Sequence, residues 1–131
     1  MLSRVLIVPL LLLATACATA GATATATAEV VDADTAVEML TERDELTVID
    51  VRTPAEHAAG HLAGTQLIDI QSSDFTARIG ELDRDGAYLI YCRTGNRSAA
   101  AVQAMVELGF TELYDAGGFA ELAAAGARTG P

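Results

Sequence analysis

Short apolar runs and segments with helical spacing alternate along residues 29–131. The apolar runs hold three to six residues and favour β-branched and aromatic side chains, a pattern typical of strands with at least one buried face. The clearest run, residues 87–91, follows an Asp-Gly turn. The predicted strands are residues 29–31, 47–51, 65–70, 87–91 and 111–114.

Helix signals lie between these runs. Thr53 is followed by Pro54 and, three residues on, by Glu56, which together predict a capped helix that ends before Gly60. Strands and helices joined by short connections favour an α/β fold, with a parallel central sheet of about five short strands and helices on both faces. The other predicted helices are one capped by Asp34 or Thr35, with Thr35 and Glu38 spaced as a capping box, and helices over residues 74–79, 98–108 and 119–125.

The N-terminal segment has a different pattern. Arg4 precedes residues 5–16, which carry no polar side chain except Thr15. This stretch is shorter than the ~20 residues of a membrane-spanning helix, and it is typical of the apolar region of a secretory signal peptide. Residues 1–16 are therefore predicted to be a signal peptide. Two alternatives are ordinary cleavage after Ala16 or Ala20 and an uncleaved membrane anchor.

Cys17 adds a second prediction for this segment, which is lipidation. Small residues stand directly before it, an order that resembles the lipobox of bacterial lipoproteins, in which the cysteine is lipidated and becomes the new N-terminus. Residues 17–28 are rich in Ala and Thr and predict a flexible tether. The sequence thus predicts a domain over residues 29–128, held by lipid on the extracytoplasmic face of a bacterial membrane, with a secreted soluble protein as the alternative.

Composition narrows the functional classes. The 131 residues leave room for one domain. A net charge of −10, with all eight cations being Arg, disfavours nucleic-acid binding. The two cysteines, Cys17 and Cys92, stand 75 positions apart, and no His/Cys cluster accompanies them. We therefore expect no disulfide scaffold and no structural metal.

The loop that begins at Cys92 carries the strongest chemical signal. Cys92 follows the clearest strand and precedes the longest predicted helix, where backbone N–H groups and the helix dipole favour an anion. These groups and the flanking Arg side chains are expected to lower the thiol pKa below its free value of ~8.5. The alternative is a buried cysteine that only fills space. The candidate anion-binding residues are Arg93, Thr94, Gly95, Asn96, Arg97 and Ser98.

Residues 29–125 resemble a single-domain rhodanese, a sulfurtransferase. The resemblance implies that Cys92 attacks a sulfane sulfur donor such as thiosulfate, forms a persulfide and passes the sulfur to cyanide or a thiol. It implies no metal and no organic cofactor, and we expect the protein to be a monomer. Four segments carry it: residues 49–52 with Glu56 (the "DVR…E" element), residues 60–64 ("GHIxGA"), residues 92–98 ("CRxGxRS") and residues 109–119 ("GF…V…GG").

Supporting roles are expected for several charged residues. Arg93 and Arg97 are predicted to attract an anionic donor, although Arg97 could instead be structural and tied to Asp50. Asp50 ends the neighbouring strand and is predicted to brace the loop, with a solvated carboxylate as the alternative.

The candidate site also includes Arg52, Glu56 and His61. Arg52 and Glu56 are four residues apart at a helix start, so we expect them to pair with each other. The resemblance implies that His61 locks a loop rather than acting as a base. His57 stands where the family usually has an aromatic residue.

Two other functions stay open. Cysteine phosphatases also hold a thiolate in a backbone nest that ends in Arg, but their loop is longer than the four residues between Cys92 and Arg97. The other alternative is a rhodanese-fold binding or regulatory module in which Cys92 is present but catalyses no sulfur transfer.

Overall fold

The structure is a computed structural model that describes residues 25–131. The predicted signal peptide, Cys17 and most of the predicted tether lie outside the described residues. No helix in residues 25–131 combines the length and the apolar character that crossing a bilayer requires.

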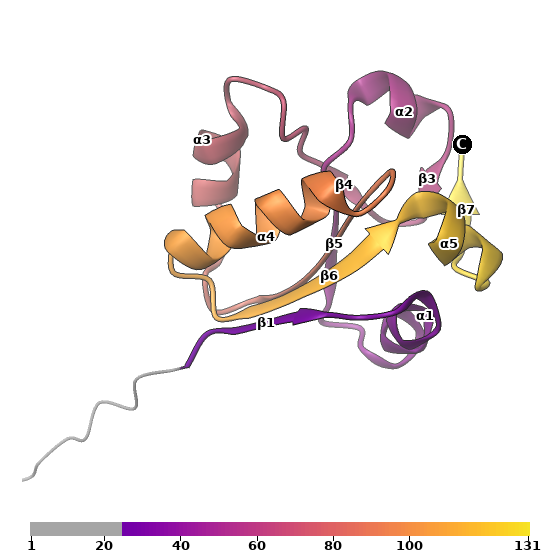
Figure 1. The fold of residues 1–131 in the computed structure, drawn as a ribbon, viewed down its shortest axis with the longest axis horizontal. Helices are drawn as coiled ribbons and strands as arrows, with labels where there is room; N and C mark the ends of the chain where they lie inside the picture. The colour runs from indigo at the N-terminus through magenta and orange to yellow at the C-terminus, as the bar shows by residue number, and fades with distance from the viewer. Residues whose placement is uncertain (1–24) are drawn as a thin grey trace, which may run out of the picture.

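Five parallel strands form the central sheet, in the order β1-β6-β5-β2-β4 (Figure 1). This arrangement confirms the predicted α/β fold with a parallel sheet of about five strands. β5 lies in the middle, and each of its residues is buried because strands cover both of its edges and helices cover both faces. The strands are β1 Thr27–Val30, β2 Thr47–Asp50, β4 Gln66–Leu67, β5 Ala87–Cys92 and β6 Glu112–Gly118.

Helices cover both faces of the sheet, as predicted. α3 and α4 supply side chains to one apolar cluster, and α1 and α5 supply them to the other. Figure 1 shows α3 and α4 on one side of the strands and α1 on the opposite side. The helices are α1 Ala33–Glu42, α2 Pro54–Ala58, α3 Phe75–Gly80, α4 Asn96–Glu107 and α5 Phe119–Ala124.

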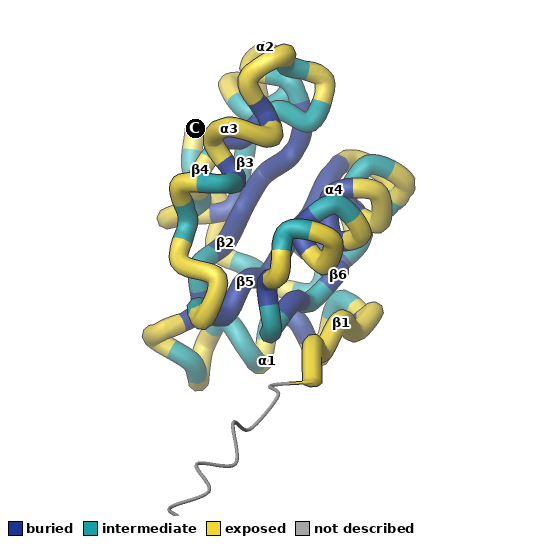
Figure 2. Tube along the Cα trace, turned by 90° about the vertical axis from the view of Figure 1, so that its left-hand side faces the viewer, coloured by how far each residue is buried: buried dark blue, intermediate teal, exposed yellow. Residues whose placement is uncertain are grey.

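Successive side chains of β5 point to opposite faces of the sheet, so the position of each residue in the strand decides which apolar cluster it joins. Tyr88, Ile90 and Cys92 join the cluster beneath α3 and α4, whereas Leu89 and Tyr91 join the cluster beneath α1 and α5. Figure 2 shows β2 and β5 as the buried centre of the fold. Cys92 is therefore held on a rigid strand and turns its side chain toward the α4 side.

Several predicted boundaries at the N-terminal end were wrong. β1 begins at Thr27, inside the segment assigned to the tether, because its backbone pairs with β6 even though all four of its side chains are exposed. α1 is capped by Asp32 instead of Asp34 or Thr35, since the Asp32 carboxylate accepts a hydrogen bond from the Thr35 N–H at 2.8 Å.

Two short strands were missed. β3 His61–Leu62 and β7 Thr129–Gly130 form a separate antiparallel pair, which ties the C-terminal segment to the chain after α2. The strand predicted over residues 65–70 is limited to β4, and β6 extends to Gly118 instead of ending at Tyr114.

Candidate functional site

Cys92 ends β5, and its sulfur lies inside a tight loop that leads into α4. The residue is fully buried. The Gly95 N–H donates to Sγ at 3.0 Å, and the Ser98 Oγ lies 3.7 Å from Sγ. Gly95 adopts φ +96°, the left-handed region that favours glycine, and this conformation folds the loop back over the sulfur.

The helix predicted over residues 98–108 begins earlier, at Asn96. Gly95 is the N-cap residue, and Ser98 lies in the first turn, where its hydroxyl donates to the Gly95 carbonyl at 3.0 Å. The first-turn N–H groups of a helix lack partners within the helix, so they are available to an anion held in the loop.

The environment of Cys92 favours its thiolate. Burial alone would raise the pKa of the Cys92 thiol, but hydrogen bonds from Ser98 and from the backbone of Gly95 and Thr94 outweigh it and hold the pKa below its ordinary value. The buried sulfur therefore lies among hydrogen-bond donors that favour its thiolate, the form in which a cysteine can act as a nucleophile.

Two glycines of β6 form the wall behind the loop. Cys92 pairs in register with Gly118, and a Cβ placed on Gly118 would lie 2.6 Å from the Arg93 carbonyl oxygen. A Cβ on Gly95 would touch Gly117 Cα at 3.6 Å. The Gly117-Gly118 pair is therefore the surface on which the loop rests.

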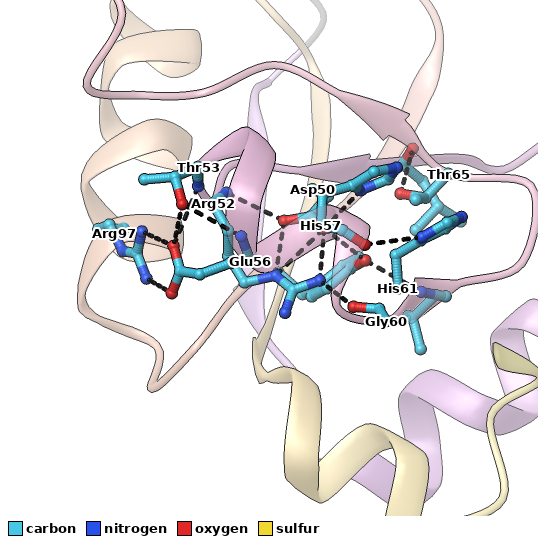
Figure 3. A network of polar contacts seen from close by, with 12 residues as sticks. Asp50, Arg52, Thr53, Glu56, His57, Gly60, His61, Thr65 and Arg97 are labelled. Atoms are coloured by element: carbon cyan, nitrogen blue, oxygen red, sulfur yellow. Dashed lines mark hydrogen bonds and ion pairs between the residues drawn. The ribbon is translucent and has the colours of Figure 1, made fainter. Parts of the chain in front are cut away.

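Arg97 is paired with Glu56, across 41 positions of sequence. Its Nη1 and Nη2 donate to the two Glu56 carboxylate oxygens, each at 2.7 Å (Figure 3). Thr53 adds the predicted capping box, with its N–H donating to Glu56 at 3.0 Å. The predicted Arg52–Glu56 pair and the alternative Arg97–Asp50 pair are both wrong, because α2 turns Glu56 toward the first turn of α4.

Asp50 lies at the centre of a buried network instead of bracing the loop directly. Its carboxylate accepts hydrogen bonds from Arg52 Nη2 at 2.7 Å, from His57 Nδ1 at 3.0 Å and from the Tyr91 hydroxyl at 2.9 Å. Burial disfavours the carboxylate, yet the hydrogen bonds from Arg52 and His57 hold the Asp50 pKa below its usual value. Asp50 thus fixes the position of Tyr91, the residue before Cys92. Its support for Cys92 is indirect and passes through the strand.

His61 lies on the far side of this network. Its Nδ1 contacts the His57 carbonyl oxygen at 3.0 Å, and its ring stacks on the His57 ring with centroids 3.8 Å apart. His61 also pairs with Gly130 in the β3–β7 ladder. These contacts fit the expected loop-locking role, since none of the hydrogen bonds among residues 25–131 joins His61 to Cys92.

Sequence reasoning missed two contributors to the site. The Tyr91 hydroxyl donates to Asp50 and accepts from the Leu62 N–H at 3.1 Å, so it joins β5 to the chain after α2. Phe119 stacks under the Arg52 guanidinium, which lies 4.5 Å from the ring centroid. The apolar run over residues 87–91 placed Tyr91 in a predicted strand without revealing the partner of its hydroxyl.

The Glu56–Arg97 pair predicts a pH dependence of stability. Hydrogen bonds from Arg97 lower the Glu56 pKa from 4.5 to about 2, so the stabilisation is full above pH 4.5 and is lost as the pH falls toward 2. Both side chains are about one-quarter exposed, so we expect on the order of 1–2 kcal/mol.

Chemical denaturation of the wild type and Glu56→Gln between pH 7 and pH 3 measures this contribution. The difference between the two proteins should shrink as the pH falls below 4.5. A difference that stays constant over that range would contradict the assignment.

Residues 32–125, more than half of the chain, match the family of rhodanese-like domains. Among curated proteins, the chain is similar to the thiosulfate sulfurtransferase GlpE of Pseudomonas putida, with 36% identity over 84 residues, which cover 63% of this chain and 74% of the relative. It is also 37% identical over 68 residues to the probable adenylyltransferase/sulfurtransferase MoeZ of Mycobacterium tuberculosis, covering 52% of this chain and 17% of that protein.

Solved structures agree with the fold. A rhodanese-related protein from Thermoplasma volcanium is 31% identical, with a TM-score of 0.67 over 78% of this chain and 97% of that one. The rhodanese-like domain of the Alr3790 protein from Anabaena shares the fold at 24% identity, with a TM-score of 0.69 over 76% of each chain. The chain therefore belongs to the family of rhodanese-like domains.

Proposed function

We propose that this protein is a sulfurtransferase that carries a sulfane sulfur on Cys92 as a persulfide. The observation that carries the proposal is the Cys92 sulfur itself, buried, hydrogen-bonded by the Gly95 N–H and favoured as a thiolate. Family membership and relatives named as sulfurtransferases support the same class of reaction.

With thiosulfate as donor, the first step balances without a cofactor. The Cys92 thiolate attacks the outer sulfur, a new S–S bond forms, and the S–S bond within thiosulfate breaks. Sulfite leaves with the electron pair, and the enzyme keeps a Cys92 persulfide anion. The N–H groups of the loop and of the first turn of α4 then stabilise the negative charge on the terminal sulfur, as such groups stabilise a phosphate or an oxyanion in other sites.

The test is the intact mass of the purified protein after incubation with thiosulfate. We expect a gain of one sulfur atom that dithiothreitol removes, followed by thiocyanate production when cyanide is added. A protein that gains sulfur but transfers none would be a binding module. Turnover of an aryl phosphate without sulfur uptake would favour the phosphatase alternative.

Arg93 supplies the unpaired positive charge at the loop. Arg93 is exposed and forms no ion pair among residues 25–131, whereas Arg97 is occupied by Glu56. Arg93→Gln is therefore expected to raise the KM for thiosulfate about 3–10-fold with little change in kcat, since it removes attraction felt equally by the bound donor and the transition state. Arg84→Gln, at the opposite end of β5, is the control for net charge in steady-state kinetics. Equal KM values for the two variants would contradict this role.

We also propose export and lipidation at Cys17. The apolar stretch before Cys17 and the small residues next to it support this. In a bacterial host, the wild type should incorporate a labelled fatty acid and partition into detergent, whereas Cys17→Ala should do neither. A mature N-terminus at Gly21 in the wild type would instead show ordinary secretion.

A further inference from the structure

A cavity of about 290 Å³ opens beside the Cys92 loop. It lies between α2, the loop and the start of α5, and Arg93, the residue after Cys92, forms part of its rim. Its volume suits a small organic molecule rather than a peptide. Its lining includes Arg52, Glu56, Ala59, Arg93, Phe119 and Ala120.

Arg52 brings an incompletely used guanidinium to this cavity. The residue is 4% exposed, and its Nε and Nη2 donate to Asp50 and to the Gly60 carbonyl. Among the described residues, Nη1 has no hydrogen-bond partner, and Figure 3 shows this nitrogen outside the dashed network. No buried side-chain nitrogen in residues 25–131 lacks a partner, so Nη1 is open to solvent at the cavity, where its N–H groups can donate to an anionic ligand.

The charges around the cavity favour the same ligand. Both carboxylate oxygens of Glu56 are engaged by Arg97, so this acid does not repel an anion as a free carboxylate would. Arg93 adds a second guanidinium at the rim. The cavity therefore offers two Arg side chains to one negative group.

The remaining wall is apolar. Phe119 presents its ring beneath Arg52, and Ala59 and Ala120 leave room for a short carbon chain. An inorganic anion such as thiosulfate has no apolar part to place against this wall. A ligand with a carboxylate at one end and a short apolar stem matches both halves of the cavity.

We propose that this cavity binds the stem and carboxylate of a small mercapto acid that accepts sulfur from Cys92. This inference rests on the sulfurtransferase function proposed above. The acceptor loses its thiol proton to solvent, and its thiolate attacks the terminal sulfur of the Cys92 persulfide. A new S–S bond forms, the enzyme S–S bond breaks, and the electron pair returns to the Cys92 sulfur. The product is an organic persulfide.

The test compares three acceptors at equal thiolate concentration with thiosulfate as donor. 3-Mercaptopropionate, neutral 2-mercaptoethanol and cationic cysteamine have stems of similar length. We expect kcat/KM for 3-mercaptopropionate to exceed that for 2-mercaptoethanol about tenfold, with cysteamine lowest. Equal values for all three would overturn the proposal.

A matched pair of variants distinguishes binding of the acceptor in the cavity from general electrostatic attraction by Arg93. Ala120→Leu fills the cavity and should lower the ratio of 3-mercaptopropionate to cyanide efficiency at least fivefold. Ala124→Leu makes the same change at an exposed position of α5 that does not line the cavity, and it should leave that ratio unchanged. An unchanged ratio in Ala120→Leu would overturn the assignment of the site.

A binding measurement distinguishes failure of the site from failure of the function. Butyrate, which has the stem and carboxylate but no thiol, should shift the amide NMR signals of Gly60, Phe119 and Ala120, and butylamine should not. If butyrate binds and cyanide transfer is absent, the sulfurtransferase function is wrong and the site stands. If cyanide transfer occurs and butyrate shifts none of these signals, the site is wrong and the function stands.

Discussion

Cys92→Ser is expected to abolish sulfur transfer, by roughly 10³-fold or more, while the protein remains folded. Ser is nearly isosteric with Cys, so the fully buried position stays filled and the β5 pairing is unaffected. The hydrogen bonds that lower the Cys92 pKa cannot ionise an alcohol at neutral pH, so the nucleophile is lost. The measurement is thiocyanate formation from thiosulfate and cyanide, with the intact mass as a second readout.

Thermal unfolding of the variant is the control, because loss of activity carries meaning only if the melting temperature stays near that of the wild type. Residual transfer within tenfold of the wild type would show that another group carries the sulfur. Loss of transfer with continued sulfur uptake in the mass spectrum would contradict the role of Cys92 as the carrier.

Features coded by neighbouring residues were predictable from the sequence. The capping box of Thr53 and Glu56 forms as expected, because its hydrogen bonds join residues three positions apart. β5 was predicted almost to the residue, since a compact apolar run after an Asp-Gly turn has few other structures open to it. The parallel sheet follows from the alternation of such elements.

Features that depend on tertiary contacts were not predictable in this way. Helical spacing pairs Arg52 with Glu56, but Arg52 precedes the N-cap of α2 and folds back onto Asp50. Glu56 is then free to reach Arg97, which only the assembled fold brings near. The start of α4 was predicted too late for a related reason. Ser98 is a residue type that often caps helices, but the left-handed conformation of Gly95 makes Gly95 the N-cap residue.

Gly118→Ala is expected to damage the site severely without touching any reacting group. Gly118 has φ −102° and ψ 146°, an extended conformation open to any residue, so the effect is purely steric. The new Cβ would meet the Glu121 carboxylate, which can rotate away, and the Arg93 carbonyl oxygen at 2.6 Å, which belongs to the loop backbone. The loop must move, and overpacking of this kind costs about 1–3 kcal/mol.

Because Arg93 directly follows Cys92, that movement disturbs the Gly95 N–H contact with Sγ. We therefore expect kcat for sulfur transfer to fall at least tenfold and the Cys92 thiol to alkylate at a higher pH than in the wild type. Gly80→Ala is the matched control, since a Cβ there meets no heavy atom within 4 Å. Adding Glu121→Ala to Gly118→Ala separates the two contacts. If the double variant regains full activity, the carboxylate caused the loss and the Gly118 wall does not position the loop. If activity stays low, the backbone of Arg93 is the group that Gly118 accommodates.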